Sequence, residues 1–323
     1  MGKLLFKCAF TALFLGCVLF AGSLAYWRTE AFQELERTED TARFREMPDT
    51  AKIAVFGTSH GEDAFQYPPE GSTFFNFSLA AQTPLYDAAM MRQFQDHIPR
   101  GGLVILTVSY MSPYWTGTEE SFDSRQPRYY RILGPENIVD VDLGRYFLTR
   151  YFPILTLDPP ELAEAFFSHP DGSAVTREEV GRRQLPAESI PSEQERVLRD
   201  HWSLIEPVFP EVNPAMWNAY REMLELCREK GWKAVLVTPP YPAEYSACFP
   251  GGFYESFLER VSSLAEEYGV PYLDYSHDEA FAGRHDLFKN LDHLNFTGAE
   301  QFDRRFFAEA EALGLLDTSP QHP

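Results

Sequence analysis

The fold is indicated most clearly by the stretch Lys52-Ile-Ala-Val-Phe-Gly-Thr-Ser-His-Gly-Glu62. Residues 53–56 form a short apolar run that ends at Gly57, which predicts a buried strand leading into a tight turn. Open α/β sheets bind their ligands at this carboxyl edge of the strands. Ser59 lies in the turn and is a candidate nucleophile. It is equally a candidate N-cap of the following helix, because serine is a common cap.

Four further apolar runs predict strands. They cover residues 73–77, 103–108, 233–238 and 270–274. Amphipathic spacing predicts helices that begin at Pro84 and Pro214, and another across residues 253–268. A last helix is predicted after a capping box of Thr297 and Glu300, with Leu313 on its buried face. The alternation predicts an α/β fold, a three-layer α/β/α sandwich around a five-stranded parallel sheet.

The N-terminus predicts a membrane anchor. Lys3 and Lys7 precede an uncharged run from Cys8 to Trp27, about 20 residues and roughly 30 Å as a helix. A cleaved signal peptide is the alternative, with residues 23–25 as its cleavage site. The lysines favour a cytoplasmic N-terminus. The sequence thus predicts a single-pass cytoplasmic (inner) membrane protein with an extracytoplasmic or periplasmic domain.

Charge density and the positions of prolines and aromatics divide the rest of the chain into segments. Residues 28–50 are dense in charge and are predicted to form a stalk, before a domain over 51–316 and a tail over 317–323. Between 112 and 210, prolines and aromatics interrupt the α/β pattern, which predicts an inserted lid or substrate wall. Its Tyr and Arg side chains suit sugar or acyl-donor contacts, and the aromatics equally suit packing onto the core.

A polar segment near the end supplies a partner for Ser59. A serine hydroxyl needs a general base, and the base needs an orienting group. His293 is the candidate base, in the segment Asn290-Leu-Asp-His-Leu-Asn295. Asn290, Asp292 and Asp274 are the alternatives for the orienting group.

These blocks resemble the SGNH/GDSL hydrolase superfamily. The resemblance covers about residues 52–110 and 212–314 and rests on Gly57-Thr-Ser-His60, Asn76-Phe-Ser-Leu-Ala-Ala-Gln82 and His293-Leu-Asn295. It is greatest to membrane-anchored extracytoplasmic members, which include alginate O-acetyltransferase-like proteins and the D-alanyl transfer proteins of teichoic acid synthesis. It implies a flavodoxin-like fold, with Ser59 as nucleophile and His293 as base.

The resemblance also implies roles for neighbouring residues. The backbone N–H groups of Ser59 and Ala81 are the expected oxyanion donors, because Ala81 matches the second-block glycine. Asn76 is expected to fix the turn after the second strand, and His60 to line the pocket. Tyr241, after the fourth strand, is a further candidate substrate contact.

The chain departs from the superfamily pattern at two positions. Asn290 stands where the pattern has the aspartate of its D-x-x-H pair, and asparagine can orient an imidazole without stabilising its charge. No asparagine follows the third strand, so Ser109 and Tyr110 are the candidate replacement donors.

The function expected is serine-dependent acyl transfer or ester hydrolysis, with O-acetyl as the acyl group, on a cell-surface or exported polysaccharide. Its partners would be that carbohydrate or an acylated carrier, and a membrane-bound O-acyltransferase. The alternative is a non-catalytic SGNH-like carbohydrate-binding or scaffold protein, which the two departures favour. No cofactor or metal is expected, and a net charge of -20 argues against nucleic acid.

Overall fold

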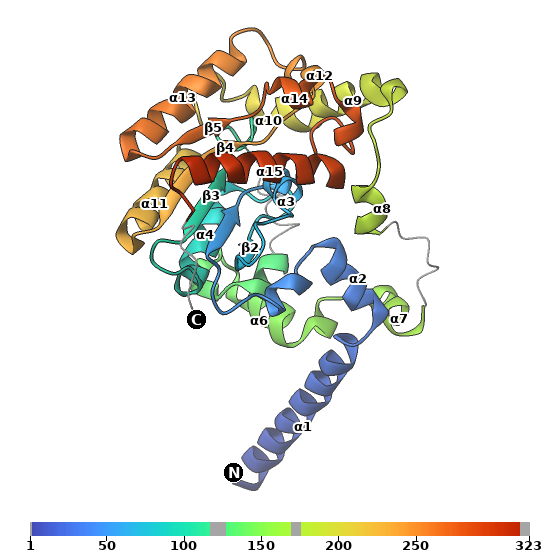
Figure 1. Ribbon diagram of the computed structural model, residues 1–323. Coiled ribbons are helices and arrows are strands. Elements are labelled where there is room, and N and C mark those ends of the chain that lie inside the picture. Colours follow the sequence, from blue (N-terminus) through green and yellow to red (C-terminus); the bar gives the residue numbers. More distant parts are fainter. Residues whose placement is uncertain (1, 117–126, 169–175, 317–323) are drawn as a thin grey trace. The chain divides into compact units, whose positions relative to one another are not determined.

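A computed structural model describes residues 2–116, 127–168 and 176–316. The predicted tail over 317–323 and two parts of the predicted insertion lie outside these residues. The fold is α/β with five parallel strands in the order β2-β1-β3-β4-β5, which confirms the predicted class and sheet (Figure 1). The strands are β1 (Ile53–Phe56), β2 (Phe74–Asn76), β3 (Leu103–Thr107), β4 (Lys233–Thr238) and β5 (Tyr272–Asp274).

The chain divides into two compact units. Met1–Glu46 and Glu119–Ala174 form the N-terminal unit, and Met47–Thr118 and Val175–Pro323 form the sheet unit. This differs from the predicted stalk over 28–50 and from the single insertion over 112–210. The described residues 127–168 belong with the N-terminus, whereas residues 176–210 belong with the sheet.

The N-terminal unit is helical around a small apolar core. Its elements are α1 (Gly2–Tyr26), α2 (Glu30–Thr38), η1 (Ala42–Arg45), helical residues 127–132, η3 (Pro135–Asn137), α6 (Leu143–Tyr151), η4 (Pro153–Leu155) and α7 (Pro159–Phe167). Helix α1 is long and apolar enough to cross a membrane. Phe32 of α2 is buried with Tyr26 and Ala165. The stalk prediction missed this contact because apolar residues are sparse in residues 28–50.

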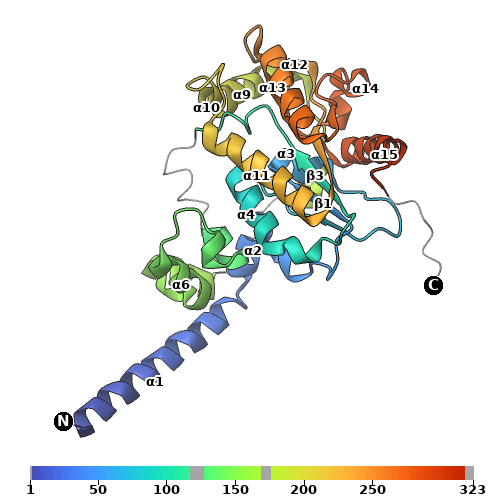
Figure 2. The ribbon, with the colours of Figure 1, turned by 90° about the vertical axis from the view of Figure 1, so that its left-hand side faces the viewer.

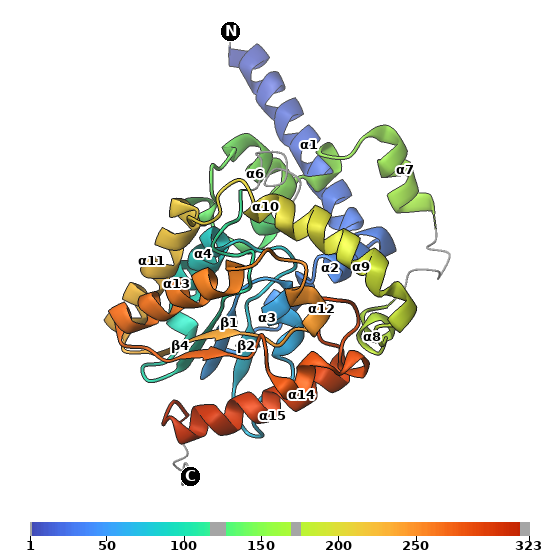
Figure 3. The ribbon, with the colours of Figure 1, turned by 90° about the horizontal axis from the view of Figure 1, so that it is seen from above.

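In the sheet unit, helices pack around the strands. They are α3 (Ser59–Ala64), α4 (Pro84–Phe94), α8 (Arg177–Gly181), α9 (Ile190–Val197), the π-helical turn η6 (Leu198–Trp202), α10 (Ser203–Ile205), α11 (Pro214–Lys230), α12 (Ala243–Ser246), α13 (Phe253–Tyr268), α14 (Glu279–Ala282) and α15 (Phe296–Ala312). The short turns are η2 (Gln95–His97), η5 (Ala187–Ser189) and η7 (His285–Leu287). Helix α11 packs against α4 (Figure 2), and α9 packs against α12 (Figure 3).

The start of the last helix differs from the prediction. Helix α15 begins at Phe296, because the Asn295 side chain accepts a hydrogen bond from the Gly298 N–H and caps it. The predicted capping box of Thr297 and Glu300 therefore lies inside the helix and is wrong. Leu313, predicted on the buried face, follows the helix and is 50% exposed.

The sheet register sets the turn that carries Ser59. Phe56 ends β1 opposite Leu106 of β3, and both strands are buried along their whole length. The next residue, Gly57, has a φ of 153°, and a Cβ there would lie 1.6 Å from the Thr107 hydroxyl oxygen. Only glycine fits this contact between β1 and β3. The chain thereby turns sharply into α3 at the carboxyl edge of the sheet.

Candidate active site

Ser59 and His293 are joined by a hydrogen bond. Ser59 is the first residue of α3, and its Oγ lies 2.8 Å from His293 Nε2. The N-cap of α3 is Thr58, whose hydroxyl accepts from the His60 N–H at 3.2 Å. The serine is therefore not the cap, and its hydroxyl is available to the imidazole. A hydroxyl bonded to an imidazole is the arrangement that nucleophilic catalysis requires.

The backbone around His293 is held by the preceding turn. The Asn290 side-chain oxygen accepts from the His293 N–H at 2.9 Å and from the Asp292 N–H at 3.3 Å. The same oxygen lies 3.1 Å from His293 Nδ1, and Asp292 Oδ2 lies 3.2 Å from that nitrogen. Asn290 and Asp292 thus both face Nδ1. Asp274, the third sequence candidate, instead accepts hydrogen bonds from Tyr254 and Ser276.

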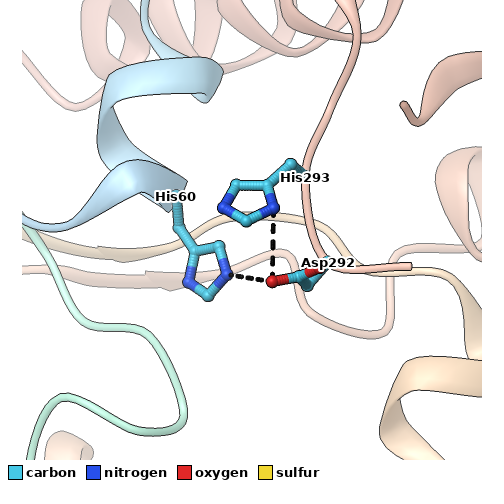
Figure 4. Close-up of side chains that lie close together, drawn as sticks. All are labelled: His60, Asp292 and His293. Carbon is cyan, nitrogen blue, oxygen red and sulfur yellow. Dashed lines mark hydrogen bonds and ion pairs between the residues drawn. The ribbon is translucent and has the colours of Figure 1, made fainter. Parts of the chain in front are cut away.

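The charged and polar groups of the site lie around Asp292. Its Oδ2 lies 3.4 Å from Nε2 of His60 and 3.4 Å from Nε2 of His201, and its Oδ1 accepts from Arg196. Figure 4 shows His60 and His293 approaching the same carboxylate oxygen from different segments of the chain. The side chain of Asp292 is fully buried. One carboxylate therefore faces three imidazoles and one guanidinium.

These contacts determine the charge states around Asp292. Burial alone raises the pKa of Asp292, but the electrostatic interaction and hydrogen bond with His293 and the hydrogen bond from His60 hold it well below 3.8. Burial lowers the pKa of His60, and it lowers that of His201 to about 4. At neutral pH the site therefore contains an ionised Asp292, and His60 and His201 are neutral.

The hydrogen-bond network assigns tautomers to both neutral imidazoles. An ionised carboxylate only accepts, so the Nε2 atoms of His60 and His201 carry the protons that face Asp292. Their Nδ1 atoms lie 3.4 Å from the Tyr241 hydroxyl and 3.0 Å from the Tyr245 hydroxyl, respectively. Burial raises the pKa of Tyr241 and Tyr245 well above 10, so both hydroxyls stay protonated and donate.

His293 follows the same pattern with one difference. Its Nδ1 proton faces Asn290 and Asp292, and its Nε2 accepts from Ser59, as the other two imidazoles accept from tyrosines. The His293 side chain is 14% exposed, against 2% for His60. His293 is thus the imidazole that can meet a substrate.

His60, Asp292 and His293 also have the residue types and spacing to hold a metal ion. Arg196 already places a cation on the same carboxylate, and a divalent ion there would be repelled by it. The tyrosine, serine and carboxylate contacts of the imidazoles form a complete hydrogen-bond network. We interpret the cluster as that network.

Two of the predicted site residues, Asn76 and Ala81, are notable for the backbone around them. Asn76 donates to the backbone oxygens of Gly61 and Phe65 and accepts from the Ser78 N–H, each at 3.0 Å. It ties the end of β2 to α3, in agreement with its expected turn-fixing role. Ala81 has a φ of 48°, in the left-handed region that favours glycine. Its backbone conformation therefore fits the glycine with which the resemblance aligns it.

The other predicted substrate contacts are buried. His60, expected to line the pocket, lies beneath His293 and contacts Asp292 and Tyr241. Tyr241 is fully buried and reaches His60. Ser109 is bonded to Ser112 at 2.6 Å, and the Tyr110 hydroxyl lies 3.5 Å from His277 Nδ1. Both side chains are engaged outside the Ser59–His293 pair, so we assign neither to an oxyanion.

Sequence reasoning missed four residues of the network: Glu193, Arg196, His201 and Tyr245. Arg196 donates to Glu193 at 2.9 Å and to Asp292, and Glu193 in turn accepts from the Leu291 N–H. The first three residues come from α9 and η6, within the segment predicted as an irregular insertion. Arg196 and His201 are five residues apart, a spacing that does not place two side chains on one face of an α-helix, so helical periodicity does not connect them.

We expect His201→Gln to reduce the pH dependence of stability. The pKa of His201 is about 4 in the folded chain against an ordinary 6.5, so the unfolded chain binds the proton first. This residue therefore removes up to about 3 kcal/mol of stability as the pH falls from 6.5 to 4. Glutamine can keep both hydrogen bonds without titrating.

The measurement is the free energy of unfolding by urea of the detergent-solubilised chain, at about pH 4.5 and about pH 7. His97→Gln, a half-buried histidine outside the network, is the matched control. An unchanged difference between the two pH values in His201→Gln would contradict the assigned neutral state.

At the carboxyl edge of β1, a serine is thus bonded to a histidine whose other nitrogen faces Asn290 and Asp292. This is the geometry that a nucleophile, a base and an orienting group require. Comparison with protein-family models and with curated proteins finds no match for this chain.

Proposed function

We propose that this protein is a serine-dependent acyltransferase or acyl esterase of the SGNH type. The observation that supports it most is the 2.8 Å contact between Ser59 Oγ and His293 Nε2, with Asn290 and Asp292 on the opposite imidazole nitrogen. The acyl group we propose is O-acetyl, and the acceptor a cell-surface or exported polysaccharide.

The proposed reaction has two halves. Ser59 Oγ attacks the acyl carbonyl carbon while His293 Nε2 takes the hydroxyl proton, and the same proton is returned to the leaving oxygen. An acyl-serine remains. In the second half His293 takes a proton from water or from a sugar hydroxyl while the oxygen of that group attacks the acyl carbon. The bond between this carbon and Ser59 Oγ then breaks, and His293 returns the proton to Ser59 Oγ. Esterase and transferase differ only in that second acceptor.

Two features support stabilisation of the charges that form. Asp292 is ionised, and it lies 3.2 Å from His293 Nδ1, where imidazolium charge develops. Ser59 is the first residue of α3, so its backbone N–H has no carbonyl one turn earlier in the helix and suits an oxyanion. The N–H of Ala81 is the second proposed donor.

The proposal also includes the layers of the fold, a lid and the membrane anchor. We propose a flavodoxin-like three-layer sandwich, and a lid that includes α9 and η6. Support for the lid comes from Arg196 and His201, which these two elements bring to Asp292. We also propose that α1 anchors the chain in the cytoplasmic membrane with the sheet unit on the extracytoplasmic side. A membrane-bound O-acyltransferase is the proposed acyl source.

A non-catalytic binding or scaffold role is the second candidate. It is favoured by Asn290 at the aspartate position and by the engagement of Ser109 and Tyr110 in other contacts. Such a protein would keep its cellular role without the Ser59 hydroxyl. Chemical trapping of an acyl-serine separates the two candidates.

The test is intact mass of the full-length chain in detergent after brief incubation with p-nitrophenyl acetate. The whole chain is needed because Tyr26, at the end of α1, is buried in the N-terminal unit. We expect one acetyl adduct, mapped to the peptide that contains Ser59 and absent from Ser59→Ala. No adduct and no ester turnover above that of the variant would favour the scaffold.

A further inference from the structure

The N-terminal unit exposes a row of large apolar side chains on α6. Leu143, Phe147 and Tyr151 recur every four residues, so they share one helix face, and they are 64%, 52% and 42% exposed. Leu155 of η4 extends the row and is 47% exposed. We call these four residues the α6 face. Large exposed apolar patches mark contact with another surface or with a membrane.

The α6 face is continuous with the apolar helix α1. The rings of Phe20 and Phe152 lie 6.3 Å apart, those of Phe152 and Phe147 5.6 Å, and those of Phe147 and Tyr151 5.1 Å. Element η4 approaches α1 so closely that a Cβ on Gly22 would lie 2.8 Å from the Ile154 side chain. An aromatic series therefore leads from α1 onto α6.

The position along α1 sets the depth of this contact. A hydrocarbon core of about 30 Å corresponds to about 20 helical residues. Counted from Lys3 or Lys7 at the cytoplasmic boundary, the opposite boundary falls near Ser23 or near Trp27. Phe20 and Gly22, where α1 contacts the rest of the unit, thus lie at the outer edge of the core. Aromatic side chains concentrate at this level of a bilayer.

The charge of α6 suits the same location. Its sequence, Leu143-Gly-Arg-Tyr-Phe-Leu-Thr-Arg-Tyr151, contains two arginines and no acidic residue, although the chain has a net charge of -20. Arg150 is used inside the unit, where it donates to the backbone oxygens of Tyr130 and Leu133. Arg145 is exposed on the other side of α6 from the apolar row, because it lies two residues from both Leu143 and Phe147. A basic, aromatic amphipathic helix is typical of an anionic lipid interface.

We propose that the α6 face lies in the outer interfacial layer of the lipid bilayer, beside the point where α1 leaves the membrane. This rests on the proposed membrane anchoring by α1 and not on the chemistry of Ser59. The occupant of the face is lipid, with the rings and leucines at the acyl boundary and Arg145 among the head groups. The contact would hold the N-terminal unit at a fixed depth.

The test measures the depth of single labelled cysteines in the full-length chain. The accessible cysteines are removed by Cys8→Ala, Cys17→Ala and Cys248→Ser, and the buried Cys227 is kept. A single new cysteine is then introduced by Phe147→Cys or by Leu143→Cys. Both positions are exposed, so the fold should tolerate the change. Each protein carries an environment-sensitive fluorophore in phosphatidylethanolamine and phosphatidylglycerol vesicles, with or without lipid bearing a shallow nitroxide quencher.

Two further labels serve as references. Cys17, retained as the only cysteine besides the buried Cys227, reports on insertion of α1. Glu211→Cys reports on an exposed position of the sheet unit. We expect a roughly twofold loss of emission at positions 143 and 147 on addition of the quencher, and little loss at position 211. Position 17, which lies inside the hydrocarbon core, is measured with a lipid that bears the nitroxide deep in its acyl chain, and it should also be quenched.

The outcomes distinguish the lipid contact of the α6 face from the proposed membrane anchoring by α1 and from the proposed role of Ser59. Quenching at 17, with 143 and 147 resembling 211, would overturn the lipid contact and leave the anchor intact. If position 147 is unquenched but crosslinks to a membrane protein in native membranes, the α6 face contacts a protein and not lipid. No quenching at 17 would overturn the anchor and the inference together. Ester turnover of the same samples reports independently on Ser59.

Discussion

Ser59→Ala is expected to reduce ester turnover by roughly four to six orders of magnitude, and adding His293→Ala should reduce it little further. The reason is that the two side chains act as one unit in the proposed reaction. Without the hydroxyl the base at 2.8 Å has no nucleophile to activate, and without the base the hydroxyl is a weak nucleophile. Effects of residues that act together are strongly non-additive.

The measurement is the turnover of p-nitrophenyl acetate by the detergent-solubilised chain, for both single variants and the double variant. Ser192→Ala, an exposed serine of α9, is the matched control and should retain full turnover. Neither Ser59 nor His293 belongs to the core, so the thermal midpoint should change little. Retained turnover in Ser59→Ala would exclude this serine as nucleophile. Multiplied losses in the double variant would mean that the two groups act separately.

The second large effect is expected at Asp292, where the Asn variant should lose both stability and activity. Arg196 and three imidazoles face this fully buried carboxylate, so its removal leaves a partly buried guanidinium without its main counter-charge. Removing one partner of a buried ion pair costs about 3–5 kcal/mol. An uncharged group also fails to stabilise the imidazolium, so turnover should fall by roughly three to four orders of magnitude.

Asn290→Ala is the matched comparison for Asp292→Asn. Asn290 also lies close to Nδ1 of His293, but it is uncharged and mainly bonds the backbone of its own turn. We expect only about a tenfold loss of turnover, the value of one or two neutral hydrogen bonds. Equal losses in both variants, or a larger loss in Asn290→Ala, would make Asn290 the orienting group and reduce Asp292 to a structural role.

The pH dependence of stability gives Asp292 a further signature. The pKa of this carboxyl is held well below 3.8 in the folded chain, so its stabilisation is present above that value. It is lost progressively as the pH falls from about 3.8 through the lower folded pKa, because over this range the unfolded chain takes up the proton and the folded chain does not. The stability difference between the parent chain and Asp292→Asn should therefore be constant near neutral pH and shrink in strong acid. Urea unfolding across this range measures it.

Local sequence patterns are sufficient to predict the strands, the α/β class and the two ends of the candidate site. These are local properties: the apolar run before Gly57 predicts a strand and a turn, and a serine at that turn lies at the ligand-binding edge of a parallel sheet. The pairing of Ser59 with His293 follows from the resemblance of two blocks. A strand of three to six residues needs only its own pattern to be recognised.

The surroundings of His293, in contrast, depend on contacts between distant segments of the fold. Asn290 and Asp292 are close in sequence, and the fold brings both to one imidazole nitrogen. Arg196 and His201 reach Asp292 from about 90 residues away, through helices whose sequence resembles any other amphipathic or irregular stretch. Local patterns show which side chains are apolar, but contacts between distant segments depend on how the helices pack. The buried network around Asp292 therefore cannot be predicted from the sequence pattern.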